Sequence, residues 1–183
     1  PDILINEHLD TVLKGAWESN INNQSRWVIF SDLHMGDGST KDDFKPNSEL
    51  FQCALRDYYL KRNYSLMLNG DVEELQRFSL DVILKNWNLV YKLFDAFANK
   101  NRLAKTYGNH DLQLKVQKPP YDYQMSEACK LSYEGDHIFI YHGHQASKKY
   151  QLQNDLVGFT LKYFANPLRI KDYSVSHSSK KQY

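Results

Sequence analysis

Two short apolar runs constrain the fold of this chain most strongly. They lie in RWVIFSDLH (residues 26–34) and YSLMLNGD (residues 64–71), and neither run alternates between apolar and polar residues. A strand with this pattern is buried on both faces, which is typical of a parallel sheet covered by helices. Because residues with helical periodicity lie between the two runs, the sequence predicts a βαβ unit.

Helix-like and strand-like segments alternate through the rest of the chain as well. A third strand is predicted to start at residue 102, and residues 128–144 are predicted to form two strands joined at a Gly-containing turn. Asn47 or Ser48 is expected to cap the second helix, and Ser79 the third. Apolar residues recur at helical spacing in four segments, residues 3–17, 48–59, 79–97 and 150–165.

This alternation predicts a single α/β domain over residues 1–183, built on right-handed βαβ units. No repeat, low-complexity tract or linker divides the chain. We expect an N-terminal helix at residues 3–17, a core that carries the polar motifs at residues 26–144, and a C-terminal helical segment at residues 149–183.

The composition excludes several classes of protein. A net charge of +1 over 183 residues gives no specific signal of nucleic-acid binding. No apolar run approaches the length of a membrane span, about 18–20 residues, so we expect no transmembrane segment. The two cysteines, Cys53 and Cys129, lack CxxC spacing and are predicted to be reduced thiols, which indicates a cytoplasmic protein.

Polar side chains that can bind metals directly follow the predicted strands. In open α/β sheets, ligands bind beyond the carboxyl ends of the strands, so residues at these ends meet at one edge of the sheet. The motifs SDLH, NGD, GNHD and HGH each end one predicted strand. We therefore expect one site with the candidate residues Asp32, His34, Asp71, Asn109, His110, Asp111 and His142.

The donor atoms of this set favour particular metals. The two carboxylates, two imidazoles and one amide of the five proposed ligands, without any thiolate, suit Mn²⁺, Fe or Zn²⁺. These ligands are Asp32, His34, Asp71, Asn109 and His142. An extended backbone at residues 32–34 is expected to direct Asp32 and His34 to the same side, and Gly70 and Gly108 to let the chain turn sharply. A carboxylate such as Asp71 can bridge two cations about 3.5–4 Å apart, a spacing suited to in-line attack on phosphorus.

At these residues the chain resembles the metallophosphoesterase (calcineurin-like) superfamily. The family pattern runs Asp-x-His, Gly-Asp, Gly-Asn-His-Asp/Glu, a later His and then Gly-His-x-His, and the resemblance covers residues 26–144. It implies a four-layer α/β/β/α sandwich. It also implies a hydrolase in which a dinuclear-metal-activated water cleaves a phosphoester or pyrophosphate bond. The matching positions are residues 32–34, 70–71, 108–111 and 142.

The resemblance also implies a role for each matched residue. Asp32 and His34 would hold the first of two divalent ions, with Mn²⁺ preferred and Fe or Zn²⁺ also suitable. Asp71 would bridge the two ions, and Asn109 and His142 would hold the second. The substrate would be a phosphorylated small molecule or a nucleotide-like molecule.

Two further roles follow from the resemblance at the third motif. His110 would lie beside the phosphate and donate a proton to a phosphoryl oxygen or to the leaving group. Asp111 would orient His110. GDVEE, with its acidic residue Glu74, is most similar to the UDP-2,3-diacylglucosamine pyrophosphatase-like branch, although that branch usually carries Arg where this chain has His110.

The chain departs from the family pattern after His144. Gly-His-x-His is absent, and the later residues contain almost no strand-like run. We therefore expect the C-terminal part of the second sheet to be missing from this chain. Either the chain is a fragment of a longer protein or its metal site is incomplete. The sheet would then expose one face, including Trp27 and Phe30, to water or to a partner.

Alternative functions stay open at this point. A catalytically impaired scaffold for protein partners is favoured by the missing motif and disfavoured by the presence of His110. A nuclease is disfavoured because the chain has no basic stripe. Each motif taken singly is more often an ordinary turn than a metal site, and His144 is equally consistent with a partner of a metal ligand and with an exposed side chain.

Overall fold

The computed structural model describes residues 3–117 and 119–146. Within these residues the protein is of the mixed α/β class, as predicted, with four α-helices and two sheets. The helices are α1 (Ile3–Lys14), α2 (Ser48–Cys53), α3 (Leu80–Asn86) and α4 (Asn88–Ala98). The strands are β1 (Trp17–Asn20), β2 (Trp27–Phe30), β3 (Ser65–Asn69), β4 (Leu103–Thr106), β5 (Met125–Ser126), β6 (Ala128–Tyr133) and β7 (Asp136–Tyr141).

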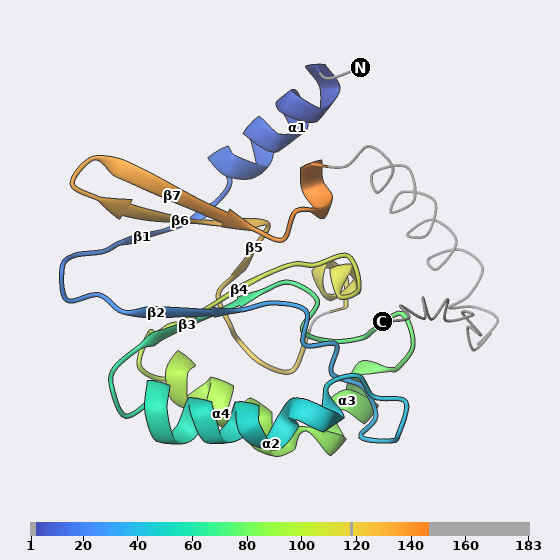
Figure 1. Cartoon of the computed structure of the whole chain (residues 1–183). Coiled ribbons are helices and arrows are strands. Elements are labelled where there is room, and N and C mark those ends of the chain that lie inside the picture. Colours follow the sequence, from blue (N-terminus) through green and yellow to red (C-terminus); the bar gives the residue numbers. More distant parts are fainter. Residues whose placement is uncertain (1–2, 118, 147–183) are drawn as a thin grey trace, which may run out of the picture.

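The first sheet is entirely parallel and has the strand order β2-β3-β4-β5. Helix α2 connects β2 to β3, and α3 and α4 connect β3 to β4, so the predicted βαβ arrangement is confirmed. All three helices lie on the same face of this sheet (Figure 1). Since β2, β3 and β4 run in the same direction, the loops that follow them leave from one edge of the sheet.

The second sheet has the order β1-β6-β7, with β1 parallel to β6 and β6 antiparallel to β7. It lies on the face of the first sheet that the three helices leave open, and α1 lies on its outer side (Figure 1). The layers therefore run from α2–α4 through the first sheet and the second sheet to α1.

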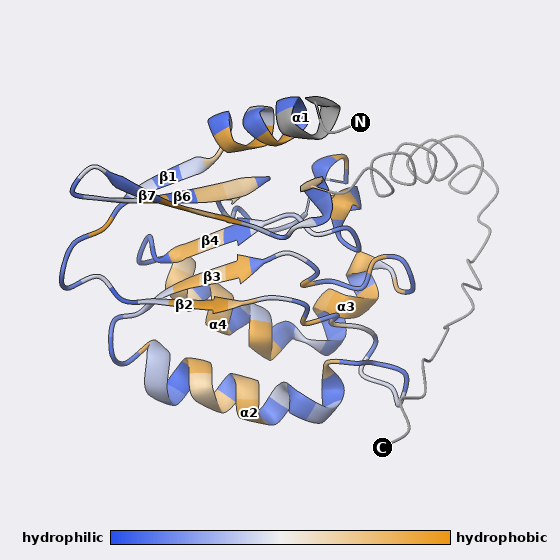
Figure 2. Cartoon of the chain, turned by 45° about the horizontal axis from the view of Figure 1, so that its top comes forward, coloured by the Kyte–Doolittle hydropathy of each residue, from blue (hydrophilic) through white to orange (hydrophobic). Residues whose placement is uncertain are grey.

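Two apolar cores hold these layers together. The larger core lies between the first sheet and its helices and includes Leu66, Leu68, Ile83 and Phe94. A smaller core, formed by Met67, Ala104, Cys129 and Leu131, lies between the two sheets. Strands β2 and β3 are accordingly mostly hydrophobic (Figure 2). Alternate residues of β3 serve the two cores, which explains why its run shows no polar alternation.

The predicted N-terminal helix at residues 3–17 is wrong at its C-terminal end. Helix α1 ends at Lys14, and Trp17 is the first residue of β1. The Trp17 ring packs edge-on against Trp27, with 6.2 Å between the ring centroids, in the core between the sheets. Trp17 also continues the helical spacing of the preceding apolar residues, so the sequence pattern does not separate this short strand from the helix.

The predicted helix at residues 79–97 is two helices that meet at Trp87, where φ is −106° and ψ is 25°. The Trp87 indole N–H donates hydrogen bonds to the Gly36 carbonyl and to Asp42 Oδ2, at 3.1 and 2.9 Å. Asn47 and Ser79 occupy the predicted N-cap positions of α2 and α3, but neither side chain makes the capping hydrogen bond.

The predicted pair of strands at residues 128–144 is confirmed as the β6–β7 hairpin, but it belongs to the second sheet. The expectation that Trp27 and Phe30 lie on an uncovered face is wrong. Trp27 packs in the core between the sheets. The Phe30 ring packs edge-on against Phe51, with 4.9 Å between the centroids, on the helical side.

The predicted helix at residues 150–165, together with the segment 149–183 that contains it, lies outside the described residues. In the part of the chain that the structure describes, no helix combines the length and the apolar character required to cross a membrane.

Candidate metal centre

Side chains that follow four different strands line one cavity of about 380 Å³. The strands come from both sheets, since β2, β3 and β4 belong to the first sheet and β7 belongs to the second. The expectation of a site at the edge of one sheet is therefore corrected, because the two sheets contribute to it together. The cavity is lined by Asp32, His34, Asp71, Asn109, His110, His142, Gly143 and His144.

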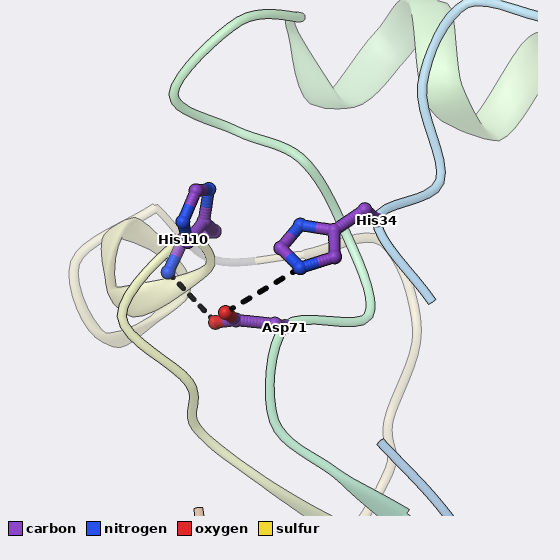
Figure 3. A group of neighbouring side chains, drawn as sticks. All are labelled: His34, Asp71 and His110. Atoms are coloured by element: carbon purple, nitrogen blue, oxygen red, sulfur yellow. Dashed lines mark hydrogen bonds and ion pairs between the residues drawn. The ribbon is translucent and has the colours of Figure 1, made fainter. Parts of the chain in front are cut away.

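The buried carboxylate of Asp71 lies at the centre of this group. Its Oδ2 is 3.3 Å from His142 Nε2 and 3.8 Å from His34 Nε2, and His34 Nε2 is also 3.8 Å from Asp32 Oδ1. The ligand atoms of His34, Asp71 and His110 lie within 4.8 Å of one another (Figure 3), as do those of Asp32, Asp71 and His142. Asp71 thus belongs to both groups.

Each histidine beside Asp71 has one ring nitrogen held by the protein. The Nδ1–H of His142 donates to the Asn69 carbonyl at 2.9 Å, and His34 Nδ1 lies 2.9 Å from Glu74 Oε2. This arrangement leaves Nε2 of both rings facing Asp71. Metal-binding histidines in proteins commonly have one nitrogen hydrogen-bonded to a carboxylate or carbonyl in this way, which fixes the tautomer and the ring orientation.

Glu74 organises two histidines at once, and sequence reasoning assigned it no role in the site. Its Oε1 lies 2.9 Å from His110 Nδ1, while its Oε2 contacts His34 Nδ1. The rings of His34 and His110 therefore meet edge to face, with 4.7 Å between their centroids. The available signal was the acidic pair Glu73-Glu74 in GDVEE, but the spacing alone does not distinguish which of the two faces the site.

Charges in the site shift several pKa values. Burial alone would raise the pKa of Glu74, but its hydrogen bonds with His110 and His34 outweigh burial and lower it to about 2. Burial alone would lower the pKa of His142, but the Asp71 carboxylate outweighs burial and raises it to about 9. The hydrogen bond to Glu74 raises the pKa of His34. Imidazolium groups thus balance the carboxylates, and a bound cation would replace these protons.

The backbone of the candidate ligands is left-handed at three positions. Asp32, His34 and Asp71 have φ values of 57°, 48° and 52°, which are uncommon for residues other than Gly. The extended conformation expected for residues 32–34 is therefore wrong. Such conformations are retained where the surrounding structure determines them, and they cluster at functional sites.

Two glycines let the loops approach one another closely. A Cβ atom at Gly108 would lie 2.0 Å from Asp71 Oδ1, and one at Gly70 would lie 2.5 Å from the His142 ring. Gly70 also has a positive φ of 76°, as expected for a sharp turn, whereas Gly108 has no positive φ. The role of Gly108 is therefore to give Asp71 space, and not to turn the chain.

Replacing Gly108 by Ala is expected to displace Asp71, because the new methyl group would overlap both the carboxylate and the backbone N of that residue. The chain should lose metal affinity and about 1–3 kcal/mol of folding stability, the usual cost of an overpacked site. Isothermal calorimetry with Mn²⁺ and thermal unfolding measure the two effects. Gly15→Ala is the matched control, since a Cβ at Gly15 makes only ordinary van der Waals contacts, at 3.6 and 3.8 Å, and Gly15 has no positive φ. Unchanged Mn²⁺ affinity in Gly108→Ala would contradict this role.

The expected role of Asp111, to orient the His110 ring, is corrected by the structure. Asp111 is fully buried and accepts hydrogen bonds from the backbone N–H groups of Gly108 and Val72, at 2.6 and 3.0 Å. Burial raises the pKa of its carboxyl group. Asp111 therefore joins the loop after β4 to the loop after β3, and Glu74 is the residue that holds the His110 ring.

The remaining residues of the cavity differ in what holds them. The backbone carbonyl of Asn109 accepts a hydrogen bond from Gln76 Nε2 at 3.2 Å. Asn109 lines the cavity beside His110. His144 is 8% exposed, so it is not a solvated side chain. Its Nδ1 has no hydrogen-bond partner among the described residues, and burial, followed by the charge of His142, lowers its pKa to about 4.

The low pKa of Glu74 predicts how stability depends on pH in the metal-free protein. A carboxyl group whose pKa falls on folding stabilises the fold above its ordinary pKa, near 4.5, and this contribution is lost as the pH falls toward 2. The shift corresponds to about 3 kcal/mol. Glu74→Gln should therefore lower the free energy of unfolding at pH 6 in EDTA and reduce its change between pH 4.5 and 2. Denaturant unfolding measures both, with the exposed Glu49→Gln as control, and an unaltered pH profile would contradict the assignment.

Comparison with models of known protein families finds no match, and comparison with curated protein sequences finds none either.

Proposed function

We propose that this protein is a metal-dependent hydrolase of phosphoester or pyrophosphate bonds, with a metallophosphoesterase type of fold and site. The observation that carries the proposal is the position of Asp71, whose carboxylate belongs to two separate groups of potential ligand atoms. A carboxylate shared in this way is the arrangement that two-metal hydrolases require. The left-handed backbone at Asp32, His34 and Asp71 supports it further.

The residues present fit two divalent cations. Asp32, His34, Asp71 and His142 supply oxygen and nitrogen donors without a thiolate, and Nε2 of each histidine is left free by the hydrogen bond at Nδ1. Asp71 would contact both ions, and Asn109 adds an amide oxygen to the same cavity. This donor set favours Mn²⁺, with Fe and Zn²⁺ as alternatives. When bound, a pair of such ions lowers the pKa of a water molecule and neutralises charge on the phosphoryl group.

His110 is the residue of the chain best placed to act on the substrate. Its side chain is 27% exposed in the cavity, and Glu74 holds Nδ1, so Nε2 is the nitrogen available to a phosphoryl oxygen or to the leaving group. Nε2 would then donate a proton or a hydrogen bond to the leaving group as the ester bond breaks. The cavity is large enough for the phosphoryl part of a small phosphorylated or nucleotide-like substrate.

Release of p-nitrophenol from p-nitrophenyl phosphate and from bis(p-nitrophenyl) phosphate tests the proposal. We expect hydrolysis of at least one ester in Mn²⁺, loss of activity in EDTA, and recovery when Mn²⁺ is restored. Asp57→Asn, a change in an exposed carboxylate on the helical side, should leave the rate unchanged. Binding of metal without hydrolysis of either ester would favour a scaffold function, and failure to bind Mn²⁺, Fe²⁺ and Zn²⁺ would refute the proposal.

A further inference from the structure

A second and larger hollow lies beside the metal centre. It has a volume of about 890 Å³ and lies between the short helix Leu112–Lys115 and the segment that leads into β5. Pockets for small organic ligands have volumes of this order and are mostly lined by apolar and aromatic side chains. We call it the tyrosine groove and define it by Tyr107, Leu114, Lys115, Val116, Tyr121 and Met125.

The tyrosine groove adjoins the metal centre along the chain and in space. Tyr107 directly precedes residues 108–111, two of which line the metal cavity, and it ends at the same edge of the first sheet. At the other side of the groove, Lys115 pairs with the Glu127 carboxylate, which also accepts a hydrogen bond from Gln145 Nε2 at 3.3 Å. Gln145 directly follows His144, a lining residue of the metal cavity. One molecule can therefore place one end in the cavity and the other in the groove.

Ring stacking and hydrogen bonds to buried residues fix the aromatic wall of the groove. Tyr121 and Tyr123 stack with 4.3 Å between their centroids and an interplanar angle of 19°. The Tyr121 hydroxyl donates to Glu73 Oε1 at 3.0 Å and accepts from Lys105 Nζ at 3.2 Å. Glu73 and Lys105 form a buried ion pair. Because Glu73 precedes Glu74, which holds two histidines of the cavity, the wall and the metal centre are anchored to one loop.

The charges in the groove indicate what kind of group it accepts. Among its described lining residues the one cationic side chain is Lys115, and this ammonium group is paired with the Glu127 carboxylate. It also lies 5.3 Å from the centre of the Tyr107 ring. The lining also includes the exposed carboxylate of Asp122, which disfavours a second anionic group. The groove therefore offers aromatic and aliphatic surface, but no unpaired cation for a second phosphate or carboxylate. Planar apolar groups pack well against such surfaces.

We propose that the tyrosine groove binds the planar aromatic part of a phosphorylated substrate whose phosphoryl group enters the metal centre. This inference rests on the proposed function and adds to it the class of substrate, an aryl or nucleobase-like phosphoester with one anionic end. The groove selects the organic part of the ester, and the metal centre acts on phosphorus.

Two inert ligands that differ only in the aromatic ring provide the test. Phenylphosphonate and methylphosphonate are titrated into the full chain, loaded with diamagnetic Zn²⁺ and labelled with ¹³C in the Met methyl groups. Of the three methionines, Met125 lines the groove and Met67 lies in the core between the sheets, so Met67 is an internal control. We expect phenylphosphonate to shift the Met125 resonance and to bind about tenfold more tightly than methylphosphonate, because a ring is buried.

A substitution that fills the groove separates the ring from the phosphonate. Val116 is 86% exposed, so Val116→Trp should leave the fold intact and occupy the groove. It is expected to abolish the tenfold preference and the Met125 shift while methylphosphonate binds as before. Leu89→Trp is the matched control, because Leu89 is also an exposed apolar residue but lies on α4, away from the groove. It should change the affinity of neither ligand.

The outcomes distinguish the groove from the metal centre. If phenylphosphonate binds without any preference and without a Met125 shift, the proposal is overturned although the metal centre stands. A preference that persists in Val116→Trp overturns it equally. If neither phosphonate binds, phenol is titrated instead: a Met125 shift that Val116→Trp removes supports the aromatic groove while the proposed function fails, and no shift refutes both.

Discussion

Replacing Asp71 by Asn is expected to reduce hydrolysis by about 10³-fold or more and to remove bound metal. The amide has nearly the same shape as the carboxylate but no charge, and it offers one oxygen to two cations in place of two. Metal ions supply several kcal/mol of charge stabilisation in the transition state, and each 1.36 kcal/mol corresponds to tenfold in rate. His142 should also lose the charge that raises its pKa, because Asp71 is its main ionic partner.

Metal content by atomic emission spectroscopy and kcat for p-nitrophenyl phosphate measure these effects in the same preparation. Circular dichroism shows whether the variant folds. Asp57→Asn removes an equal charge from an exposed position and should retain both metal and activity. If Asp71→Asn is folded and keeps two equivalents of metal, the shared position of this carboxylate between the two groups has no functional meaning.

Replacing His110 by Ala is expected to lower kcat by about 10²–10⁴-fold while metal content stays nearly intact. Loss of a general acid or of a hydrogen bond to a charged transition state has effects of this size. The His110 ring is held by Glu74, and its side chain is accessible from the cavity, as a contact to substrate requires. Glu74→Gln should also lower kcat, by a smaller factor, because the His110 ring remains but its Nδ1 loses the Glu74 carboxylate that holds it.

His137→Ala is the control, since His137 is an exposed residue of β7 far along the strand from the cavity. The comparison of metal content decides between two roles for His110, because its ligand atom also lies within 4.8 Å of those of His34 and Asp71. Loss of one equivalent of metal in His110→Ala would show that His110 is a metal ligand, and the assignment to the phosphoryl group would be wrong.

Local sequence determined the parallel sheet and the place of the polar motifs. The apolar runs that end at Phe30 and Asn69 predict buried parallel strands, because only strands covered on both faces lack polar alternation. Since parallel strands end at a common edge, the positions of Asp32, His34, Asp71 and Asn109 followed from strand order alone. The presence of one candidate site was therefore predictable without coordinates.

Contacts between segments distant in sequence decided the rest. Strand β1 has four residues with alternating exposure, and only its pairing with β6 distinguishes it from an extension of α1. Likewise, nothing local to β7 indicates that it belongs to a second sheet, although this is what brings His142 to Asp71.

The sequence also could not predict the different roles of the two adjacent acidic residues after β3. Glu73 and Glu74 are adjacent and chemically equal, yet one is buried with Lys105 and the other holds His34 and His110. The sequence by itself determined which side chains reach one edge of a parallel sheet, because strand periodicity is local. Only the tertiary structure decided which partner each side chain meets, because hydrogen bonds and ion pairs depend on distances across segments far apart in the chain.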